Sequence, residues 1–237
     1  MTCAINTQWI RLAGSTGDFD AYLATPPAGR GPGLLLLQEI FGVNPHIRAV
    51  AEQFALAGFT VLAPDLFWRQ APRVELGYTG DDREQALALM RAYPRELALA
   101  DLRDSLGALR ARPECAARVG AIGYCMGGRL AFAAAALGGV DRAVAYYGGG
   151  IASQLELAAQ IRCPVQFHHA EQDASIPPEA VAAIRAAMDA SPAAAKAEFH
   201  DYPGSQHGFN CWDRAAYHPA SAALALGRSL EFLSALF

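Results

Sequence analysis

Short apolar runs alternate with helical segments along most of this chain, and that alternation limits its possible folds more than any other feature. The clearest runs are Gly33–Gln38, Phe59–Ala63, Arg118–Ile122 and Cys163–His169. Continuous apolar runs of this length are typical of parallel strands that are buried on both faces. Strands separated by helices pair in parallel, with the helices covering both faces of the sheet. The sequence therefore predicts a single α/β domain over residues 1–237 with a mainly parallel central sheet.

Composition narrows the class of protein. Hydrophobic residues make up 53% of the 237 residues and charged residues 18%, which is enough apolar material for a large core. A net charge of −4 argues against a nucleic-acid partner. We expect no membrane span and no signal peptide, because no long apolar run is present and the N-terminus lacks a basic-then-apolar pattern. The 5 cysteines show no close pairing, which favours the reducing cytoplasm. No oligomeric state follows, and a monomer is compatible with the sequence.

The stretch Gly123–Gly128 (Gly-Tyr-Cys-Met-Gly-Gly) joins a predicted strand to a predicted helix and contains a cysteine. Gly-x-Cys-x-Gly is the thiol form of the Gly-x-Ser-x-Gly nucleophile elbow. Glycines flank the nucleophile because side chains there would collide in so sharp a turn. Cys125 would then lie at a helix N-terminus, where the helix dipole favours a thiolate. The alternative is an inert buried cysteine in an ordinary turn.

Two further polar residues follow predicted strands, Asp173 after Cys163–His169 and His207 after the strand Ala197–Tyr202. Parallel strands end at one edge of the sheet, so these side chains and Cys125 are expected at the same edge. Nucleophile, acid and histidine in this order match the chain order of α/β-hydrolases. As alternatives, Asp173 could be a turn residue, and His207 could be a plain loop histidine.

The remaining acids and histidines near these positions have simpler explanations. Glu171 could compete with Asp173, but we expect it to point elsewhere because it is closer to the strand. His168 and His169 are predicted to pack in the core rather than to act in catalysis. A metal set of His200, His207 and Cys211 fits no common zinc spacing. We therefore expect no metal and no cofactor.

Several motifs in register resemble the dienelactone hydrolase family, part of the α/β-hydrolase superfamily. They are Gln38–Gly42 (Gln-Glu-Ile-Phe-Gly), Ala63–Leu66 (Ala-Pro-Asp-Leu), Gly123–Gly128, Gln172–Asp173 and Gly204–Phe209 (Gly-Ser-Gln-His-Gly-Phe). The similarity runs from the second predicted strand almost to the C-terminus. The expected fold is therefore the α/β-hydrolase fold.

The resemblance implies a catalytic triad in which Cys125 is the nucleophile, Asp173 the orienting acid and His207 the base. It also implies an oxyanion hole made by the backbone N–H groups of Ile40 and Met126. One donor after the nucleophile and one from an early strand–helix loop is the general arrangement in this superfamily.

Glu39 follows a very apolar run, where a carboxylate is costly unless something pairs with it. In the family the matching glutamate interacts with the resting thiol and takes its proton when substrate binds. The resemblance therefore implies a catalytic role for Glu39. An N-terminal helix cap is the structural alternative.

The resemblance also implies that Arg83 binds a substrate carboxylate and that Tyr146 lines the site. By composition alone, Arg83 is an ordinary solvated helix charge and Tyr146 a sheet residue. A second family arginine, four residues after the catalytic histidine, is replaced here by Cys211. This replacement weakens the case for a strongly carboxylate-anchored lactone. Trp68 and Trp212 could instead favour a larger or more apolar substrate, although plain packing is the more common role of such residues.

The resulting expectation is an enzyme, a carboxymethylenebutenolidase-like hydrolase that cleaves a dienelactone or related ester through a thioester, in the catabolism of aromatic compounds. Its partner would be a small-molecule ester or lactone. One alternative is an esterase or lactonase of other specificity. Another, from a different class, is a non-catalytic protein in which Cys125 senses peroxide or electrophiles.

Overall fold

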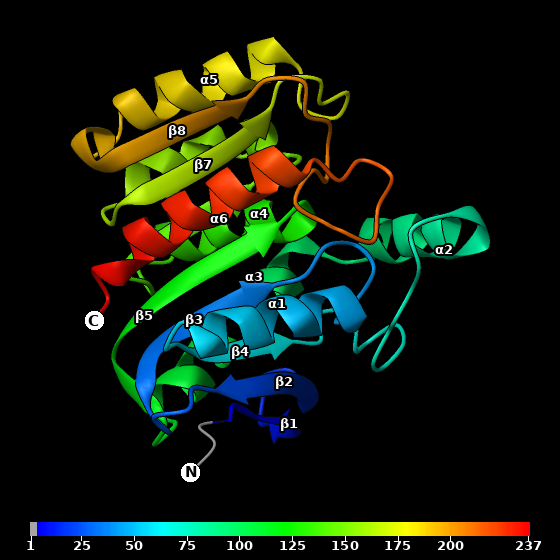
Figure 1. Cartoon of the computed structure of the whole chain (residues 1–237), viewed down its shortest axis with the longest axis vertical. Helices are drawn as coiled ribbons and strands as arrows, with labels where there is room; N and C mark the ends of the chain where they lie inside the picture. The colour runs from blue at the N-terminus through cyan, green and yellow to red at the C-terminus, as the bar shows by residue number, and fades with distance from the viewer. Residues whose placement is uncertain (1–3) are drawn as a thin grey trace. The chain divides into compact units, whose positions relative to one another are not determined.

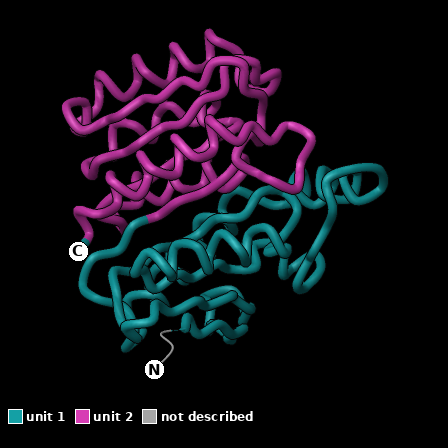
Figure 2. The backbone as a smooth tube through the Cα atoms, in the orientation of Figure 1, with its two compact units in different colours: residues 1–120, 237 teal, residues 121–236 magenta. Residues whose placement is uncertain are grey.

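The computed structural model describes residues 4–237, and Cys3 lies outside the described residues. The chain divides into two compact units, residues 1–120 together with 237, and residues 121–236 (Figure 2). Each unit contains strands and helices, and each is described separately below.

The first unit contains β1 (Asn6–Leu12), β2 (Phe19–Thr25), β3 (Gly31–Leu37) and β4 (Thr60–Pro64), in the order β1-β2-β4-β3. The β1–β2 and β2–β4 pairs are antiparallel, and the β3–β4 pair is parallel. Every residue of β3 is buried, as its continuous apolar sequence predicts. The edge strand β1 is mostly exposed and has no apolar alternation, so the sequence did not predict it.

Helix α1 (Pro45–Leu56) follows β3, and its start is encoded locally. The side chain of Asn44 accepts a hydrogen bond from the Ile47 amide at 3.2 Å, and proline occupies the first helical position. Helices α2 (Gly80–Arg91) and α3 (Arg95–Arg110) follow.

Residues 65–79 contain no helix and no strand longer than an isolated bridge. The segment is fixed by ion pairing to α3. The two guanidinium nitrogens of Arg69 lie 2.7 and 3.0 Å from the carboxylate oxygens of Asp101, which is fully buried. The Tyr93 hydroxyl donates to the same carboxylate at 3.0 Å. Because the buried Asp101 carboxylate is bound by both Arg69 and Tyr93, the loop that carries Arg69 has a defined conformation.

Strand β5 (Cys115–Tyr124) runs from the first unit into the second. It extends beyond the predicted Arg118–Ile122 at both ends, and among residues 115–118 only Cys115 is buried. The eight strands have the order β1-β2-β4-β3-β5-β6-β7-β8, a mainly parallel arrangement with α-helical connections (Figure 1).

The second unit contains three further parallel strands, β6 (Arg142–Tyr146), β7 (Val165–Ala170) and β8 (Ala197–Tyr202). Its helices are α4 (Met126–Ala136), α5 (Pro178–Asp189) and α6 (Pro219–Ser234). Short 3-10 turns occupy Ile151–Ser153, Leu155–Gln160 and Ala194–Lys196.

Successive residues of β7 point to opposite faces of the sheet. His168 contacts α6 through Ser229, whereas His169 lines a cavity together with residues of α5. Helices α6 and α5 therefore cover opposite faces of β7, and Figure 1 shows α6 in front of the strands of this unit. Both histidines are buried, which confirms the predicted core packing.

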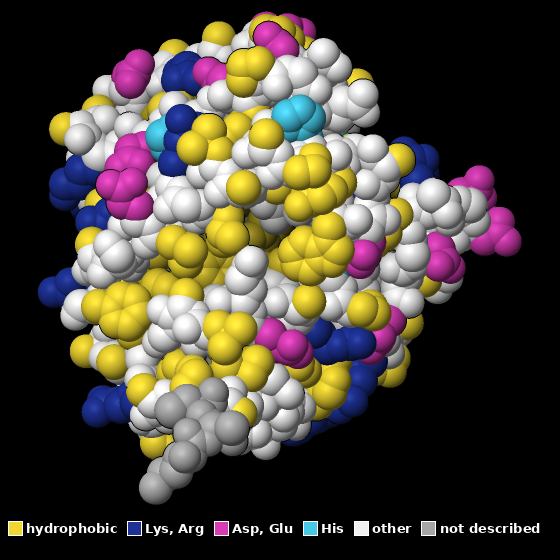
Figure 3. Space-filling model, in the orientation of Figure 1, with side chains coloured by type: hydrophobic (Ala, Val, Ile, Leu, Met, Phe, Trp, Pro, Cys, Tyr) yellow, Lys and Arg dark blue, Asp and Glu magenta, His cyan; other side chains and the backbone are white. Residues whose placement is uncertain are grey.

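The face of the molecule in Figure 3 shows Lys and Arg side chains in small separate groups among acidic and apolar side chains. On this face, positive charge is therefore interspersed with negative charge. No helix among residues 4–237 is both long and apolar enough to cross a membrane.

Candidate active site

Cys125 sits in a strained turn between β5 and α4. Its backbone has φ 55° and ψ −115°, a conformation that side chains other than glycine rarely adopt. A Cβ on Gly123 would collide with the carbonyl group of Gly127, so glycine is required there. Cys125 as a residue is partly exposed. The local geometry is therefore that of a nucleophile elbow.

The elbow places Cys125 immediately before the N-terminus of α4. Met126 is the first residue of this helix and is buried. The first N–H groups of a helix lack intrahelical acceptors and attract negative charge. A Cβ on Gly128 would be 2.5 Å from the Tyr146 carbonyl oxygen, so glycine also allows α4 to approach β6. The role of the Met126 amide as an oxyanion donor, which the resemblance implies, stays a prediction.

Asp173 lies in the loop after β7, and its side chain is only 1% exposed. One carboxylate oxygen accepts the Ser175 amide at 2.8 Å, and the other lies 2.8 Å from Nδ1 of His207. The carboxylate is held on one side by the backbone and presents its other oxygen to the histidine. This arrangement fixes the tautomer and the orientation of the imidazole.

His207 lies in the loop after β8 and connects Asp173 with Cys125. Because Nδ1 faces Asp173, Nε2 is the nitrogen left for the thiol. Burial alone would lower the pKa of His207, but its hydrogen bonds to Asp173 and Cys125 and the charges of those groups raise this pKa to about 10. The imidazolium form of His207 is therefore favoured at neutral pH. The structure thus brings together Cys125, Asp173 and His207.

The loops that carry Asp173 and His207 are tied to one another. The Gln172 amide donates to the Ser205 carbonyl at 2.8 Å, and the Glu171 amide donates to the Tyr202 carbonyl at 3.1 Å. The Glu171 carboxylate accepts the Gly204 amide at 2.8 Å. Glu171 therefore braces the loops and does not contact the histidine, which confirms that it points elsewhere.

Tyr146 ends β6 beside the elbow, and its side chain is fully buried. Its hydroxyl lies 2.7 Å from Oγ of Ser229, and its ring stacks on His168 with the centroids 4.2 Å apart. The next residue, Tyr147, has φ 33°, and its ring lies edge-on to His207 at 5.0 Å. Tyr147 is therefore the tyrosine in ring contact with the histidine, whereas a substrate-lining role for Tyr146 stays a prediction.

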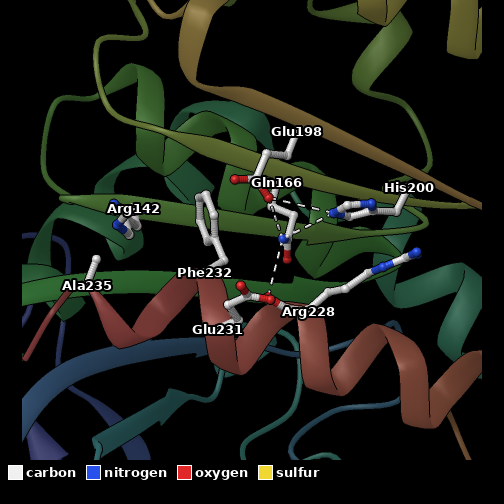
Figure 4. Close-up of a pocket in the computed structure, with 8 residues that line it drawn as sticks. All are labelled: Arg142, Gln166, Glu198, His200, Arg228, Glu231, Phe232 and Ala235. Atoms are coloured by element: carbon white, nitrogen blue, oxygen red, sulfur yellow. Dashed lines mark hydrogen bonds and ion pairs between the residues drawn. The ribbon is translucent and has the colours of Figure 1, made fainter.

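A buried polar network extends from Tyr146 to a pocket on the α6 side. Nε2 of His168 lies 3.0 Å from Oγ of Ser229 and 2.9 Å from Oε1 of Gln166. Gln166 in turn donates to Glu198 at 2.8 Å and contacts His200 at 3.3 Å (Figure 4). This pocket has a volume of ≈ 370 Å³ and lies at the beginnings of the strands, not at the carboxyl ends that carry the triad. Burial holds the pKa of His168 well below its ordinary value, so the His168 imidazole is neutral at neutral pH.

Three predicted site residues belong to the first unit. Glu39 and Ile40 directly follow β3 and its neighbour Gln38, and both are buried. Arg83 is exposed near the start of α2. Trp68 stacks on Phe19 with the ring centroids 5.6 Å apart, which is a packing role. The roles of Glu39, Ile40 and Arg83 stay predictions.

Sequence reasoning missed one cation next to the catalytic loop. Gly208 has φ 84°, and a Cβ there would collide with the guanidinium group of Arg214. Arg214 therefore lies against the residue that follows His207, whereas Cys211 is fully buried and Trp212 is 40% exposed. No sequence spacing marks this contact, because it depends on the conformation of the loop between Gly208 and Arg214.

The alternative metal set of His200, His207 and Cys211 does not form a cluster of ligand atoms in the described part of the chain. His200 lines the pocket on the α6 side, and His207 is paired with Asp173. None of the four cysteines within residues 4–237 forms a disulfide.

Comparison with known proteins agrees with this geometry. The model of the dienelactone hydrolase family matches residues 19–237. A carboxymethylenebutenolidase of Pseudomonas sp. (strain P51) is 38% identical over 218 residues, covering 92% of this chain and 90% of the relative. Carboxymethylenebutenolidase 1 of Cupriavidus pinatubonensis (strain JMP 134 / LMG 1197) is 36% identical over 223 residues, covering 94% of each chain.

A solved structure from Klebsiella pneumoniae, provisionally named a dienelactone hydrolase, has 31% sequence identity and a TM-score of 0.84. The match covers 98% of this chain and 99% of that one. The predicted α/β-hydrolase fold is therefore confirmed. The chain belongs to the dienelactone hydrolase family and is a hydrolase.

Proposed function

We propose that this protein hydrolyses a dienelactone, or a closely related ester or lactone that carries a carboxylate, through a thioester on Cys125. The observation that carries the proposal is the hydrogen-bonded series from Asp173 through His207 to Cys125, at a strained elbow. The names of the relatives, which are carboxymethylenebutenolidases, support this substrate class.

In the first half of the reaction, the Cys125 thiolate attacks the carbonyl carbon of the substrate. The tetrahedral intermediate collapses, the acyl carbon–oxygen bond breaks, and the leaving oxygen takes a proton from the His207 imidazolium. In a lactone the leaving oxygen remains attached to the acyl chain, so the ring opens and the whole substrate stays on the enzyme as a thioester.

In the second half, neutral His207 removes a proton from water, and the resulting hydroxide attacks the thioester carbon. The carbon–sulfur bond breaks, the acid leaves, and Cys125 and His207 return to their starting state. Asp173 stabilises the imidazolium, which is present at the start of the reaction and forms again when His207 takes a proton from water. The oxyanion in both intermediates accepts hydrogen bonds from the amides of Met126 and Ile40.

A carboxylate on the substrate requires cationic partners. The resemblance assigns this role to Arg83, and we propose that Arg214 contributes to it, because its guanidinium group lies against Gly208 beside the catalytic histidine. Arg214 would then supply the positive charge that Cys211 does not provide at the family position.

The alternative of a thiol sensor has less support. Reversible sensing usually needs a second, reactive cysteine. Burial raises the pKa of the Cys163 thiol to about 11 and also raises that of Cys115, so both thiols are poor nucleophiles. A thiol sensor also has no need of the pair of Asp173 and His207, whereas acyl transfer uses such a pair to move protons.

The test is kcat/KM on dienelactone and on a neutral aryl ester, for wild type, Arg83→Ala and Arg214→Ala. Each arginine variant should lose roughly tenfold to a hundredfold on dienelactone, because a charge-assisted hydrogen bond is removed, and little on the neutral ester. Arg91→Ala is the matched control, since Arg91 is an exposed arginine at the other end of α2. Equal losses on both substrates would refute carboxylate recognition, and no turnover of either by wild type would refute the hydrolase proposal.

A further inference from the structure

Helix α2, which carries Arg83 in its first turn, has little packing of its own to hold it in place. All of its residues are described, and among them only Ala86 is buried. Helices in folded proteins are held mainly by the packing of an apolar face. The orientation of α2 therefore depends on the segments that enter and leave it.

The segment that leaves α2 is fixed by a buried carboxylate. The Tyr93 hydroxyl donates to Asp101 at 3.0 Å, and Arg69 binds the same carboxylate. This contact lies beyond the last turn of α2, at the opposite end from Arg83. The orientation of the first turn then depends on the residues just before it.

Those residues form a clasp, in which residues 74–78 pair with residues 41–44 directly before α1. The Leu76 amide donates to the Phe41 carbonyl at 3.0 Å. Gly42 has φ 80°, and a Cβ there would overlap the backbone of the opposite segment. The clasp is therefore a close contact of two backbones in the first unit.

Asn44 joins this clasp to α1, and its side chain is only 2% exposed. Its Oδ1 accepts the Ile47 amide at 3.2 Å and so caps α1. Its Nδ2 donates to the Leu76 carbonyl at 3.2 Å and to the Tyr78 hydroxyl at 3.0 Å. One side chain thus binds both the start of α1 and the segment that leads into α2.

We propose that Asn44 is a positioning residue for substrate binding. By holding residues 76–78 against the start of α1, it sets the orientation of Arg83 toward the substrate carboxylate. This inference rests on the proposed function, in which Arg83 binds that carboxylate. A binding group that is already held in place loses less conformational freedom when the substrate arrives. Loss of the clasp bonds of Asn44 should therefore weaken substrate binding and spare the chemical step.

Helix capping alone is the competing explanation for Asn44. Serine caps a helix about as well as asparagine, but its single oxygen cannot cap α1 and also replace the two bonds from Nδ2. Asn44→Ser therefore keeps the cap and removes the clasp bonds. Tyr78→Phe removes one of these bonds and keeps the ring packed against Phe41, with the centroids 4.5 Å apart.

The experiment measures kcat and KM on dienelactone and on a neutral aryl ester. Asn44→Ser should raise KM for dienelactone about threefold to tenfold, with kcat and thermal unfolding nearly unchanged. Tyr78→Phe should have a smaller effect in the same direction, and KM for the neutral ester should change little in both variants. Tyr22→Phe is the matched control, because it removes a hydroxyl bond of 2.7 Å to Glu52 further along α1. It should leave both substrates unaffected.

The variant Arg83→Ala separates this inference from the proposed function. In that background Asn44→Ser should have no further effect on dienelactone, because the group that Asn44 positions is gone. If Arg83→Ala alone leaves dienelactone kinetics unchanged, the proposed carboxylate recognition is wrong and this inference fails with it.

Three other results would overturn the inference alone and leave Asn44 as a helix cap, given that Arg83→Ala raises KM for dienelactone. In the first, Asn44→Ser leaves KM for dienelactone unchanged. In the second, it raises KM equally for both substrates. In the third, its effect persists in the Arg83→Ala background.

Discussion

The backbone amide of Cys125 donates a hydrogen bond of 3.0 Å to the carbonyl oxygen of Tyr146. This bond joins the elbow to the end of β6 at the point where the chain turns into α4. Cys125, the proposed nucleophile, is therefore positioned by two neighbouring strands and not by its own turn alone. Tyr146 is hydrogen-bonded to Ser229 and stacked on His168, so these core contacts also restrain the backbone of Cys125.

Gly123→Ala should lower both stability and activity, because the new Cβ would overlap the Gly127 carbonyl group. We expect a loss of several kcal/mol or insoluble protein, as for other overpacked or strained sites. Gly107→Ala in α3 is the control. A Cβ at Gly107 meets nothing within 4 Å, so this change should stabilise the protein by about 0.5–1 kcal/mol. Urea unfolding of both variants measures the difference, and similar free energies of unfolding would contradict the close approach.

Asp173→Asn should reduce kcat by about 10²–10⁴-fold, because an amide does not hold the imidazole in its productive tautomer or stabilise its positive charge. Glu171→Gln is the matched control two residues away. It keeps an oxygen to accept the Gly204 amide and should retain nearly full activity. Steady-state kinetics on one ester substrate compares the two, and equal losses would indicate that only the loop conformation matters.

Glu39→Gln tests which group holds the thiol proton. If Glu39 takes this proton when substrate binds, as the resemblance implies, the variant should lose turnover sharply while its thermal unfolding is unchanged. If His207 already carries the proton at neutral pH, which its raised pKa favours, turnover should be unaffected. Single-turnover kinetics of thioester formation distinguishes these cases, and unchanged activity would remove the catalytic role of Glu39.

Stability should fall as the pH rises above neutrality. The pKa of His207 is about 10 in the folded protein against an ordinary value of 6.5, so the folded state binds more protons between these limits. The stabilisation is complete below pH 6.5 and is lost as the pH rises through 10, with a slope of at most about 1.4 kcal/mol per pH unit.

Asp173→Asn removes one cause of this shift and should flatten the slope of the free energy of unfolding. Denaturant titrations of wild type and variant between pH 6 and pH 10 measure both slopes. Parallel curves would mean that the pair of Asp173 and His207 does not raise the histidine pKa.

Much of the fold was predictable because buried parallel strands have a strong sequence signal. Strands β3, β4 and β7 are almost wholly buried, and their apolar runs were recognised within two residues. Strand β1 was not predicted, because only one of its residues is buried and no apolar period results. Edge strands satisfy the pairing rules of a sheet without contributing much to its core.

The proposed triad was predictable as an order of residue types after strand ends, and Asp173 and His207 lie within hydrogen-bond distance of each other in the structure. The network of Gln166, His168 and Ser229 was not, because it joins residues far apart in the sequence on β7 and α6. Arg214 was missed for a related reason. Its approach to Gly208 depends on the loop conformation and not on a fixed spacing from the histidine.

The positive φ of Cys125 also bears on how this protein could change under selection. With φ 55° and ψ −115°, the cysteine occupies backbone space that suits glycine, at a cost of about 1–3 kcal/mol. Replacing the nucleophile with glycine would relieve that strain and remove the chemistry in one step. Selection for thermal stability alone would therefore favour the loss of Cys125. Only simultaneous selection for catalytic turnover would keep a cysteine in this turn.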